Sequence, residues 1–365
     1  MANNATSSNG GRVGFSGNGV LEFERPMAQI EQQIQQLERQ EGRDCRDEVR
    51  DLRATLVQLM KKTYSNLTAW EKVQVARHQN RPQVMDYIQM VVRDFCELSG
   101  DRSFRNDRAI VTGFGRVAGH KVLIVGNRKG KDIKQKVECY FGCAHPEGYR
   151  KALLKMKLAA KFGLPIVCLI DTPGAYPGVG AEERGIAQAI AVNLLELSRL
   201  PTPIVAVVIA EGGSGGALGI GVADRIAVME HAYYSVISPE GCAAILWKTS
   251  EKAAAAAEKL KLTPPELKKL GLIDDIIKEP LGAAHRDPMA AAANLEHYLA
   301  EVLTELKRIP GETLLARRYE KLRHAGDFFV PAAKPVKKKV TVKRIASSLA
   351  PGPGLKLALA KAARV

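Results

Sequence analysis

The chain has 365 residues, of which 46% are apolar and 25% are charged. This composition is typical of a globular protein with one large domain or two. Its apolar runs are all shorter than the roughly 18 residues that a membrane-spanning helix needs, and the N-terminus lacks the hydrophobic segment of a signal peptide. We therefore expect no membrane association and a cytoplasmic location.

The positions of the cysteines argue against a metal site, and the distribution of charge indicates a basic tail. The six cysteines are scattered, and Cys139 and Cys143 have no second pair with which to complete a zinc site. Reduced thiols and no metal in this chain are therefore expected. The net charge is +15, but residues 331–365 contain nine Lys and Arg and no acidic residue, which leaves +6 for the rest. Residues 326–365 predict a basic, disordered tail.

The first hundred residues predict a leader and a helical region. Residues 1–25 begin with a Gly/Asn/Ser-rich sequence and predict a disordered leader. Residues 26–100 contain two apolar stripes at helical spacing, separated by a polar break around Gly42, which predict a helical hairpin. Two more helices are expected, over residues 69–78 and 85–98.

Residues 101–325 predict a single α/β domain. Alternating apolar and polar residues over 109–130 predict a β-hairpin, and the polar stretch 131–146 predicts a loop. The continuous runs at 164–170 and 202–210 are rich in Val and Ile, which predicts fully buried strands of a parallel sheet. Short strands that alternate with helical patterns indicate the α/β class.

A glycine-rich loop follows each of these two buried strands. The first, DTPGAYPGVGAEERG, occupies residues 171–185, and the second, EGGSGGALGIG, occupies residues 211–221. Each loop opens into a helical pattern. A strand, a glycine loop and the start of a helix together point unpaired backbone N–H groups at an anion, and glycine lets a ligand approach the backbone closely. The two loops are therefore the candidate site.

These motifs carry a resemblance to a known family. The runs at 170–185, 211–218 and 234–248, with GDRSF and PEGYRKAL upstream, are similar to the alpha subunit of the acetyl-CoA carboxylase carboxyltransferase of bacteria and plastids. The similarity extends over roughly residues 22–325, and EPLGAAH at 279–285 departs by one residue from the family's EPLGGAH. It implies a crotonase/ClpP-like spiral of ββα units with an N-terminal helical arm and a disordered basic C-terminal tail.

The resemblance also implies a reaction and its partners. In the family, the carboxyl group of carboxybiotin, held on the biotin carboxyl carrier protein, is transferred to acetyl-CoA to give malonyl-CoA, the first committed step of fatty acid biosynthesis. No covalently bound cofactor is expected, since carboxybiotin and acetyl-CoA are substrates. The expected partners are a carboxyltransferase beta subunit with a zinc ribbon, in an α2β2 assembly, the carrier protein, and biotin carboxylase, which consumes ATP.

Carboxylation of a thioester requires stabilisation of an enolate oxygen, for which backbone N–H donors suffice. The resemblance assigns this role to Gly215 and Gly216, with Gly212 and Gly213 beside them. No protein nucleophile is needed, because the ureido nitrogen of biotin can act as the base after it has lost CO2. Tight packing between strand and helix, without a ligand, is the alternative explanation of these glycines.

Arg184 is the second expected site residue. Related carboxyltransferases bind a carboxylate through an arginine at this motif, and a planar guanidinium matches a carboxylate. An ion pair with Glu182 or Glu183 is the alternative. Other residues of the same loop are expected to form a wall of the substrate site: Gly174, Ala175, Tyr176, Gly178 and Gly180.

A serine hydrolase or thioesterase is the competing enzyme class. The sequence Gly212-Gly213-Ser214-Gly215-Gly216 has the form G-x-S-x-G between a strand and a helix, which is the pattern of a nucleophile elbow. Ser214 would then be the nucleophile. Candidate partners for a triad follow it in the chain: Asp224, Asp274, His231 and His285.

Nucleic-acid binding is the non-enzymatic alternative. Residues 334–344 of the tail would bind phosphates without sequence preference and with strong salt dependence, but aromatic residues for base stacking are missing there. A nucleotide-binding P-loop is excluded, because GNRKGK at 126–131 is one residue short of the required pattern and lacks its hydroxyl residue.

Overall fold

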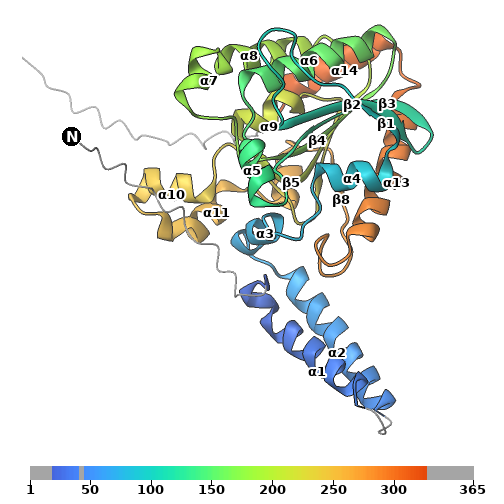
Figure 1. Ribbon diagram of the computed structural model, residues 1–365, viewed down its shortest axis with the longest axis vertical. Coiled ribbons are helices and arrows are strands. Elements are labelled where there is room, and N and C mark those ends of the chain that lie inside the picture. The colour runs from blue at the N-terminus through green and yellow to red at the C-terminus, as the bar shows by residue number, and fades with distance from the viewer. Residues whose placement is uncertain (1–18, 41–44, 327–365) are drawn as a thin grey trace, which may run out of the picture. The chain divides into compact units, whose positions relative to one another are not determined.

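The centre of the fold is a mixed β-sheet. The computed structural model describes residues 19–40 and 45–326, and in these residues eight strands form one sheet in the order β1-β2-β3-β4-β5-β6-β8, with β7 paired to β5 (Figure 1). The first three strands pair antiparallel, and all later pairs are parallel. The strands are β1 (Arg93–Glu97), β2 (Ile110–Val117), β3 (His120–Asn127), β4 (Ile166–Thr172), β5 (Ile204–Gly213), β6 (Arg225–Met229), β7 (Tyr233–Ser235) and β8 (Asp275–Ile277).

Helices cover both faces of the sheet. Helices α6, α8 and α9 pack over one face, and α4 and α13 pack over the other (Figure 1). The helices are α1 (Arg25–Glu38), α2 (Arg46–Ser65), α3 (Ala69–Ala76), α4 (Val84–Val91), α5 (Ile133–Glu138), α6 (Pro146–Lys161), α7 (Val179–Glu183), α8 (Ile186–Leu197), α9 (Ser214–Gly221), α10 (Pro239–Trp247), α11 (Ala253–Leu260), α12 (Pro264–Lys269), α13 (Pro288–Leu306) and α14 (Gly311–Arg323).

The continuous apolar runs become the two central strands. Every residue of β4 and β5 is buried, as a parallel sheet covered on both faces requires. The two strand predictions and the α/β class are confirmed. The β-hairpin is confirmed too, because β2 and β3 pair without interruption and their turn residues, Ala118 and Gly119, both have positive φ angles.

The N-terminal helices form a hairpin with a small core at its base. Helices α1 and α2 lie side by side (Figure 1). Residues 19–25, which the sequence assigns to a disordered leader, are ordered, because Leu21 is fully buried. Residues 1–18 and the predicted tail beyond residue 326 lie outside the described residues. The core at the base of the hairpin contains Leu21, Met27, Met60, Tyr64, Val75 and Ala283.

One predicted helix is too long. The helix expected over 85–98 ends at Val91, and Arg93–Glu97 form the edge strand β1. Pairing with β2 decides the structure of these residues, since strand formation depends strongly on tertiary neighbours. The sheet therefore begins inside the region predicted to be helical.

The stretch 131–146 is not a continuous loop. It contains α5, which begins after Asp132, whose carboxylate accepts the N–H of Gln135 at 2.7 Å. It also contains a 3-10 turn, Tyr140–Gly142. None of the helices in the described ranges combines the length with the apolar character that crossing a bilayer demands.

Candidate active site

The two glycine loops begin next to each other at the carboxyl edge of the sheet. Strands β4 and β5 are parallel neighbours, and Thr172, the last residue of β4, pairs with Gly212 near the end of β5. Residues 179–183 of the first loop form α7, and residues 214–221 of the second form α9. The starts of both loops therefore meet at one edge of the sheet.

The second loop is the start of a helix. Strand β5 extends through Gly213, and α9 begins at Ser214. A helix leaves its first N–H groups without intrahelical acceptors, and those of Gly215 and Gly216 belong to this first turn. They lie at the positive end of the helix dipole. The start of α9 can therefore donate hydrogen bonds to an anionic oxygen.

Packing explains some of these glycines but not all. A Cβ atom on Gly213 would lie 2.1 Å from the Pro173 carbonyl oxygen, and one on Gly216 would lie 2.3 Å from the Gly174 carbonyl carbon. Both positions must be glycine for the two loops to touch. A Cβ atom on Gly215 would meet nothing closer than 3.7 Å. Close packing therefore explains Gly213 and Gly216 but leaves Gly215 unexplained.

Ser214 occupies the corner between strand and helix. Its φ angle is +49° and its side chain is exposed, as at the elbow of a serine nucleophile. The four candidate triad partners have other contacts: Asp224 binds Arg318, Asp274 binds Lys321, His285 binds Glu24, and the His231 ring packs on Tyr64. Within the described part of the chain, none of the four hydrogen-bonds to Ser214. These four described residues therefore do not serve the serine as a base.

Arg184 binds a carboxylate of the protein itself. Its guanidinium bonds to both carboxylate oxygens of Glu147, at 3.2 Å each, and lies over the Phe104 ring at 4.8 Å. The ion-pair partner is thus Glu147 and not the adjacent Glu182 or Glu183. Burial alone would raise the pKa of Glu147, but its bonds to the arginine side chains outweigh burial and lower it. The guanidinium is held in a geometry that fits a carboxylate.

The rest of the first loop is anchored over the start of α6. The Tyr176 ring stacks on the His145 ring, with ring centres 4.1 Å apart. The backbone N–H of Tyr176 donates to the Ala144 carbonyl oxygen at 3.0 Å. Gly178 lies against the Tyr176 ring, and a Cβ atom on Gly180 would lie 3.1 Å from the Arg184 guanidinium. The predicted wall residues therefore form one ordered segment that leads to Arg184.

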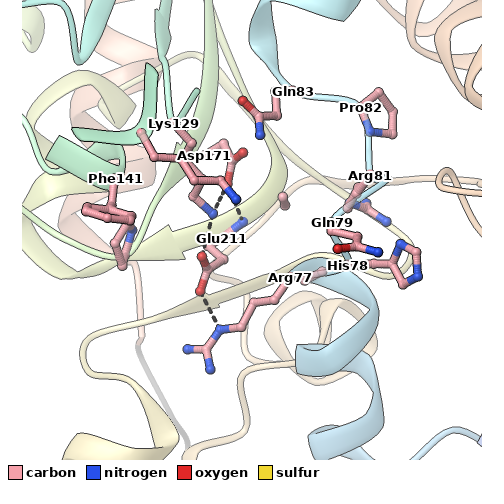
Figure 2. Close-up of a pocket in the computed structure, with 14 residues that line it drawn as sticks. Arg77, His78, Gln79, Arg81, Pro82, Gln83, Lys129, Phe141, Asp171 and Glu211 are labelled. Atoms are coloured by element: carbon pink, nitrogen blue, oxygen red, sulfur yellow. Dashed lines mark hydrogen bonds and ion pairs between the residues drawn. The ribbon is translucent and has the colours of Figure 1, made fainter. Parts of the chain in front are cut away.

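A buried ionic network, which the sequence analysis missed, holds the first residue of each glycine loop (Figure 2). The Lys129 ammonium lies between the Asp171 carboxylate, at 2.6 Å, and the Glu211 carboxylate. Glu211 also accepts a hydrogen bond from Arg77 Nε at 2.6 Å, and Arg77 Nη1 bonds to Glu240 of α10 at 2.5 Å. The "loop network" consists of Arg77, Lys129, Asp171, Glu211, Tyr233 and Glu240.

The two carboxylates of the loop network respond differently to burial. Burial raises the pKa of Asp171, and Lys129 does not fully offset this effect. Burial acts on Glu211 in the same direction, but Lys129 and Arg77 outweigh it and hold the pKa of Glu211 well below its usual range. Burial would lower the pKa of Lys129, but the two carboxylates outweigh it and raise that pKa. Lys129 therefore stays charged at neutral pH.

Four members of the loop network, Arg77, Lys129, Asp171 and Glu211, line a cavity of about 290 Å³ next to the first glycine loop. Figure 2 shows Lys129, Asp171 and Phe141 on one side of this cavity and Gln79 and Pro82 on the other. One signal of the network was present in the sequence, because each buried apolar run is followed at once by a carboxylate. A buried carboxylate requires a partner, but the spacing along the chain does not say which residue it is.

One group of described residues has the composition of a metal site. Ligand atoms of Glu24, His78 and His285 lie within 4.8 Å of one another. Most of these atoms already have partners. His285 Nε2 lies 3.0 Å from the Glu24 carboxylate, and the His78 ring contacts the Gly19 carbonyl oxygen at 2.6 Å and the Asn80 N–H at 3.1 Å. A metal ion would have to displace these hydrogen bonds.

Comparison with solved structures identifies the fold. A crystal structure of transcarboxylase 12S with methylmalonyl-coenzyme A and methylmalonic acid bound matches 62% of this chain and 42% of that chain, with a TM-score of 0.51 and 24% identity. A second crystal structure of transcarboxylase 12S, with hydrolysed methylmalonyl-coenzyme A bound, matches 62% of this chain and 41% of the transcarboxylase chain, with a TM-score of 0.50 and 25% identity. These likenesses concern the fold, which is the crotonase-like fold of carboxyltransferases, as predicted.

Comparison of sequences gives the family. The sequence model of a family described as "Acetyl co-enzyme A carboxylase carboxyltransferase-like" matches residues 20–326. The acetyl-coenzyme A carboxylase carboxyl transferase subunit alpha of Rhodopirellula baltica is 53% identical over 310 residues, which cover 84% of this chain and 97% of that protein. The subunit of the same name from Haemophilus influenzae is 51% identical over 308 residues, covering 84% and 98%. The chain belongs to this family, and the resemblance in the motifs is confirmed.

Proposed function

We propose that the chain is the alpha subunit of an acetyl-CoA carboxylase carboxyltransferase and helps to transfer the carboxyl group of carboxybiotin to acetyl-CoA. The observation that carries the proposal is the start of α9, where Gly215 and Gly216 present first-turn N–H groups beside the first glycine loop. The names of the relatives support the choice of substrate, because the chain spans nearly the full length of two such subunits.

In the proposed reaction, the main role of the protein is to stabilise negative charge. Carboxybiotin gives up CO2 and keeps the electron pair on its ureido nitrogen, which then removes a proton from the methyl group of acetyl-CoA. The enolate attacks CO2, and malonyl-CoA and biotin are formed. The N–H groups of Gly215 and Gly216 would bind an oxygen on which charge develops, and such a donor contributes about 2.7–4 kcal/mol. This chemistry needs no serine nucleophile.

Arg184 is proposed to bind the carboxyl group of the substrate during transfer. Its guanidinium already holds both oxygens of Glu147, so a substrate carboxylate would take the place of a carboxylate that the site has positioned. Residues 174–180, which lead to Arg184, would form the adjoining wall. Glu147 would then keep the guanidinium oriented when no substrate is bound.

The proposal includes partners that complete the reaction. These are a beta subunit with a zinc ribbon, in an α2β2 assembly, and the biotin carboxyl carrier protein and biotin carboxylase in the cytoplasm. The word "subunit" in the names of the relatives supports an assembly of several chains. Carboxybiotin and acetyl-CoA act as substrates in this assembly, so no covalently bound cofactor is proposed for this chain.

The proposal is tested by the reverse reaction. The chain is purified alone and together with a matching beta subunit, and carboxylation of free biotin is measured with malonyl-CoA as the donor. We expect activity only with both subunits, and a Ser214→Ala variant should retain it. If no carboxyl transfer occurs with the beta subunit, and the chain instead hydrolyses thioesters in a Ser214-dependent manner, the protein is a hydrolase.

A further inference from the structure

The regular pairing of β4 with β5 is interrupted just before the glycine loops begin. Ile170 pairs with Val208, but the next paired residues are Thr172 and Gly212, so β5 has two more residues than β4 in this interval. Such an irregularity leaves part of the strand without ladder hydrogen bonds. The relative position of the two loops therefore depends on the bonds that bridge this interval.

Side chains supply these bonds. Arg81 donates through Nε and Nη2 to the Ile209 carbonyl oxygen, at 3.0 and 2.8 Å. The Asp171 carboxylate accepts the backbone N–H of Glu211 at 3.3 Å. Lys129, two residues beyond the end of β3, places its ammonium between the side chains of Asp171 and Glu211. A single cation thus contacts the residue that starts each loop.

The ammonium separates two carboxylates that would otherwise repel each other. The Asp171 and Glu211 side chains are 3% and 8% exposed, so water screens them little. Neighbouring buried carboxylates destabilise one another's charged forms. Without the ammonium, Arg77 still bonds to Glu211, but Asp171 loses the cation that contacts it, so the loops would move apart or Asp171 would take up a proton.

A movement at the loop starts would reach the proposed oxyanion donors. Gly213 touches Pro173, and Gly216 touches Gly174, so the two loops are packed backbone against backbone. These contacts have no side chain that could adjust to a shift. A displacement of about 1 Å at a catalytic group can cost about 100-fold in rate.

We propose that Lys129 is a positioning residue for carboxyl transfer, which fixes the two glycine loops against each other and thereby aims the N–H groups of Gly215 and Gly216. Lys129 acts through Asp171 and Glu211. This inference rests on the proposed function. It also gives a role to the GNRKGK segment, which does not form a P-loop.

The test compares Lys129→Met with Lys131→Met in the full chain assembled with its beta subunit. Lys131 is a matched control, because it lies two residues further along, is 64% exposed and pairs with Asp86. We expect Lys129→Met to lower kcat for biotin carboxylation by about 10- to 100-fold and to change the KM for malonyl-CoA less than about twofold. Lys131→Met should match the wild type, and Lys129→Arg should restore most of kcat.

The pH profile separates positioning from general loss of structure. In Lys129→Met, kcat should rise as the pH falls, because a proton on one carboxylate removes the repulsion. In Lys129→Met with Asp171→Asn, that rise should disappear, because one carboxylate is already neutral. Thermal unfolding and the subunit composition of each variant are measured in parallel, so that only assembled protein is compared.

The possible failures are distinguishable. A wild-type complex without carboxyl transfer overturns the proposed function and this role with it. An active wild type with a fully active Lys129→Met variant overturns only the role of Lys129. A Lys129→Met variant that folds and assembles but shows a pH profile parallel to that of the wild type also overturns it.

Discussion

Two buried networks in this protein are both built around carboxylates, but they connect different parts of the molecule. The loop network holds Asp171 and Glu211 at the carboxyl edge of the sheet. The second, the "anchor network" of Glu24, Tyr64, His285 and Arg286, lies at the base of the N-terminal hairpin. There the Glu24 carboxylate accepts hydrogen bonds from the Tyr64 hydroxyl at 2.5 Å and the Leu21 N–H at 3.1 Å, and it lies 3.0 Å from His285 Nε2.

The difference lies in what each network joins. The anchor network connects residues 261 positions apart and fastens the hairpin to the segment around His285. The loop network connects the starts of the two glycine loops, whose backbones carry the proposed chemistry. We therefore expect a buried ionic contact of this protein to affect turnover where it borders the proposed site. Changes in the anchor network should appear in stability, and changes at the loops should appear in rate.

The largest effect is expected from Glu24→Ala. The substitution leaves the Tyr64 hydroxyl and the His285 ring without their buried acceptor, so the free energy of unfolding should fall by about 3–5 kcal/mol. Urea unfolding measures this loss, and the control is Glu31→Ala, which removes a more exposed partner of Arg286 and should cost less than about 1 kcal/mol. A drop in kcat of the assembled Glu24→Ala enzyme would contradict the comparison.

The pH dependence of stability tests the same carboxylate. Burial would raise the pKa of Glu24, but the bonds from His285 and Tyr64 outweigh it and lower the pKa from 4.5 to about 2. The stabilisation is therefore complete above about pH 4.5 and is lost as the pH falls from there toward 2; it amounts to about 3 kcal/mol. The difference in unfolding free energy between the wild type and Glu24→Gln should shrink by about 2 kcal/mol between pH 7 and pH 3. A constant difference would refute this pKa.

At the loops, two neighbouring glycines should behave differently. A methyl group on Gly216 would collide with the backbone of Gly174, so Gly216→Ala should lower kcat by about 100-fold. A methyl group on Gly215 has room, so Gly215→Ala should fold normally and lose less than about tenfold. Biotin carboxylation by the assembled complex and thermal unfolding measure both effects. Equal losses in the two variants would show that packing does not distinguish them.

The smallest effect is expected at Ser214. Since the hydroxyl has no base among the described residues and both Ser and Ala pay a similar penalty at positive φ, Ser214→Ala should stay within about twofold of the wild-type rate. Esterase and thioesterase assays on the same samples serve as the control. Loss of carboxyl transfer in this variant would make the hydroxyl part of the reaction.

The sequence predicted those parts of the fold that local pattern determines. Strands β4 and β5 were found because strands buried on both faces read as continuous apolar runs. Strand β1 was missed, because an exposed edge strand that contains Arg93 and Asp94 carries no such signal. Its structure depends on pairing with β2, which lies more than a dozen residues further along the chain.

The same limit applies to the site. The glycine loops could be recognised because each is a contiguous motif that follows a strand. The partner of Arg184 could not, since Glu147 lies 37 residues earlier and only the packing of α6 against the first loop brings them together. Lys129 is 82 residues from Glu211, and no periodicity links them. Contacts between distant charged side chains are set by the fold and not by the local sequence.

The two additional residues of β5 have a geometric consequence for the site. Two is an even number, so Val208 and Gly212 point to the same face of the sheet although the pairing with β4 is interrupted between them. At about 3.3 Å per residue, the second loop starts up to about 7 Å further along than an uninterrupted strand would place it. The length of β5 can therefore change without a change of facing only in steps of two residues. Removal of a single residue would turn the glycine segment to the opposite face, whereas removal of two would shorten the reach and preserve the facing.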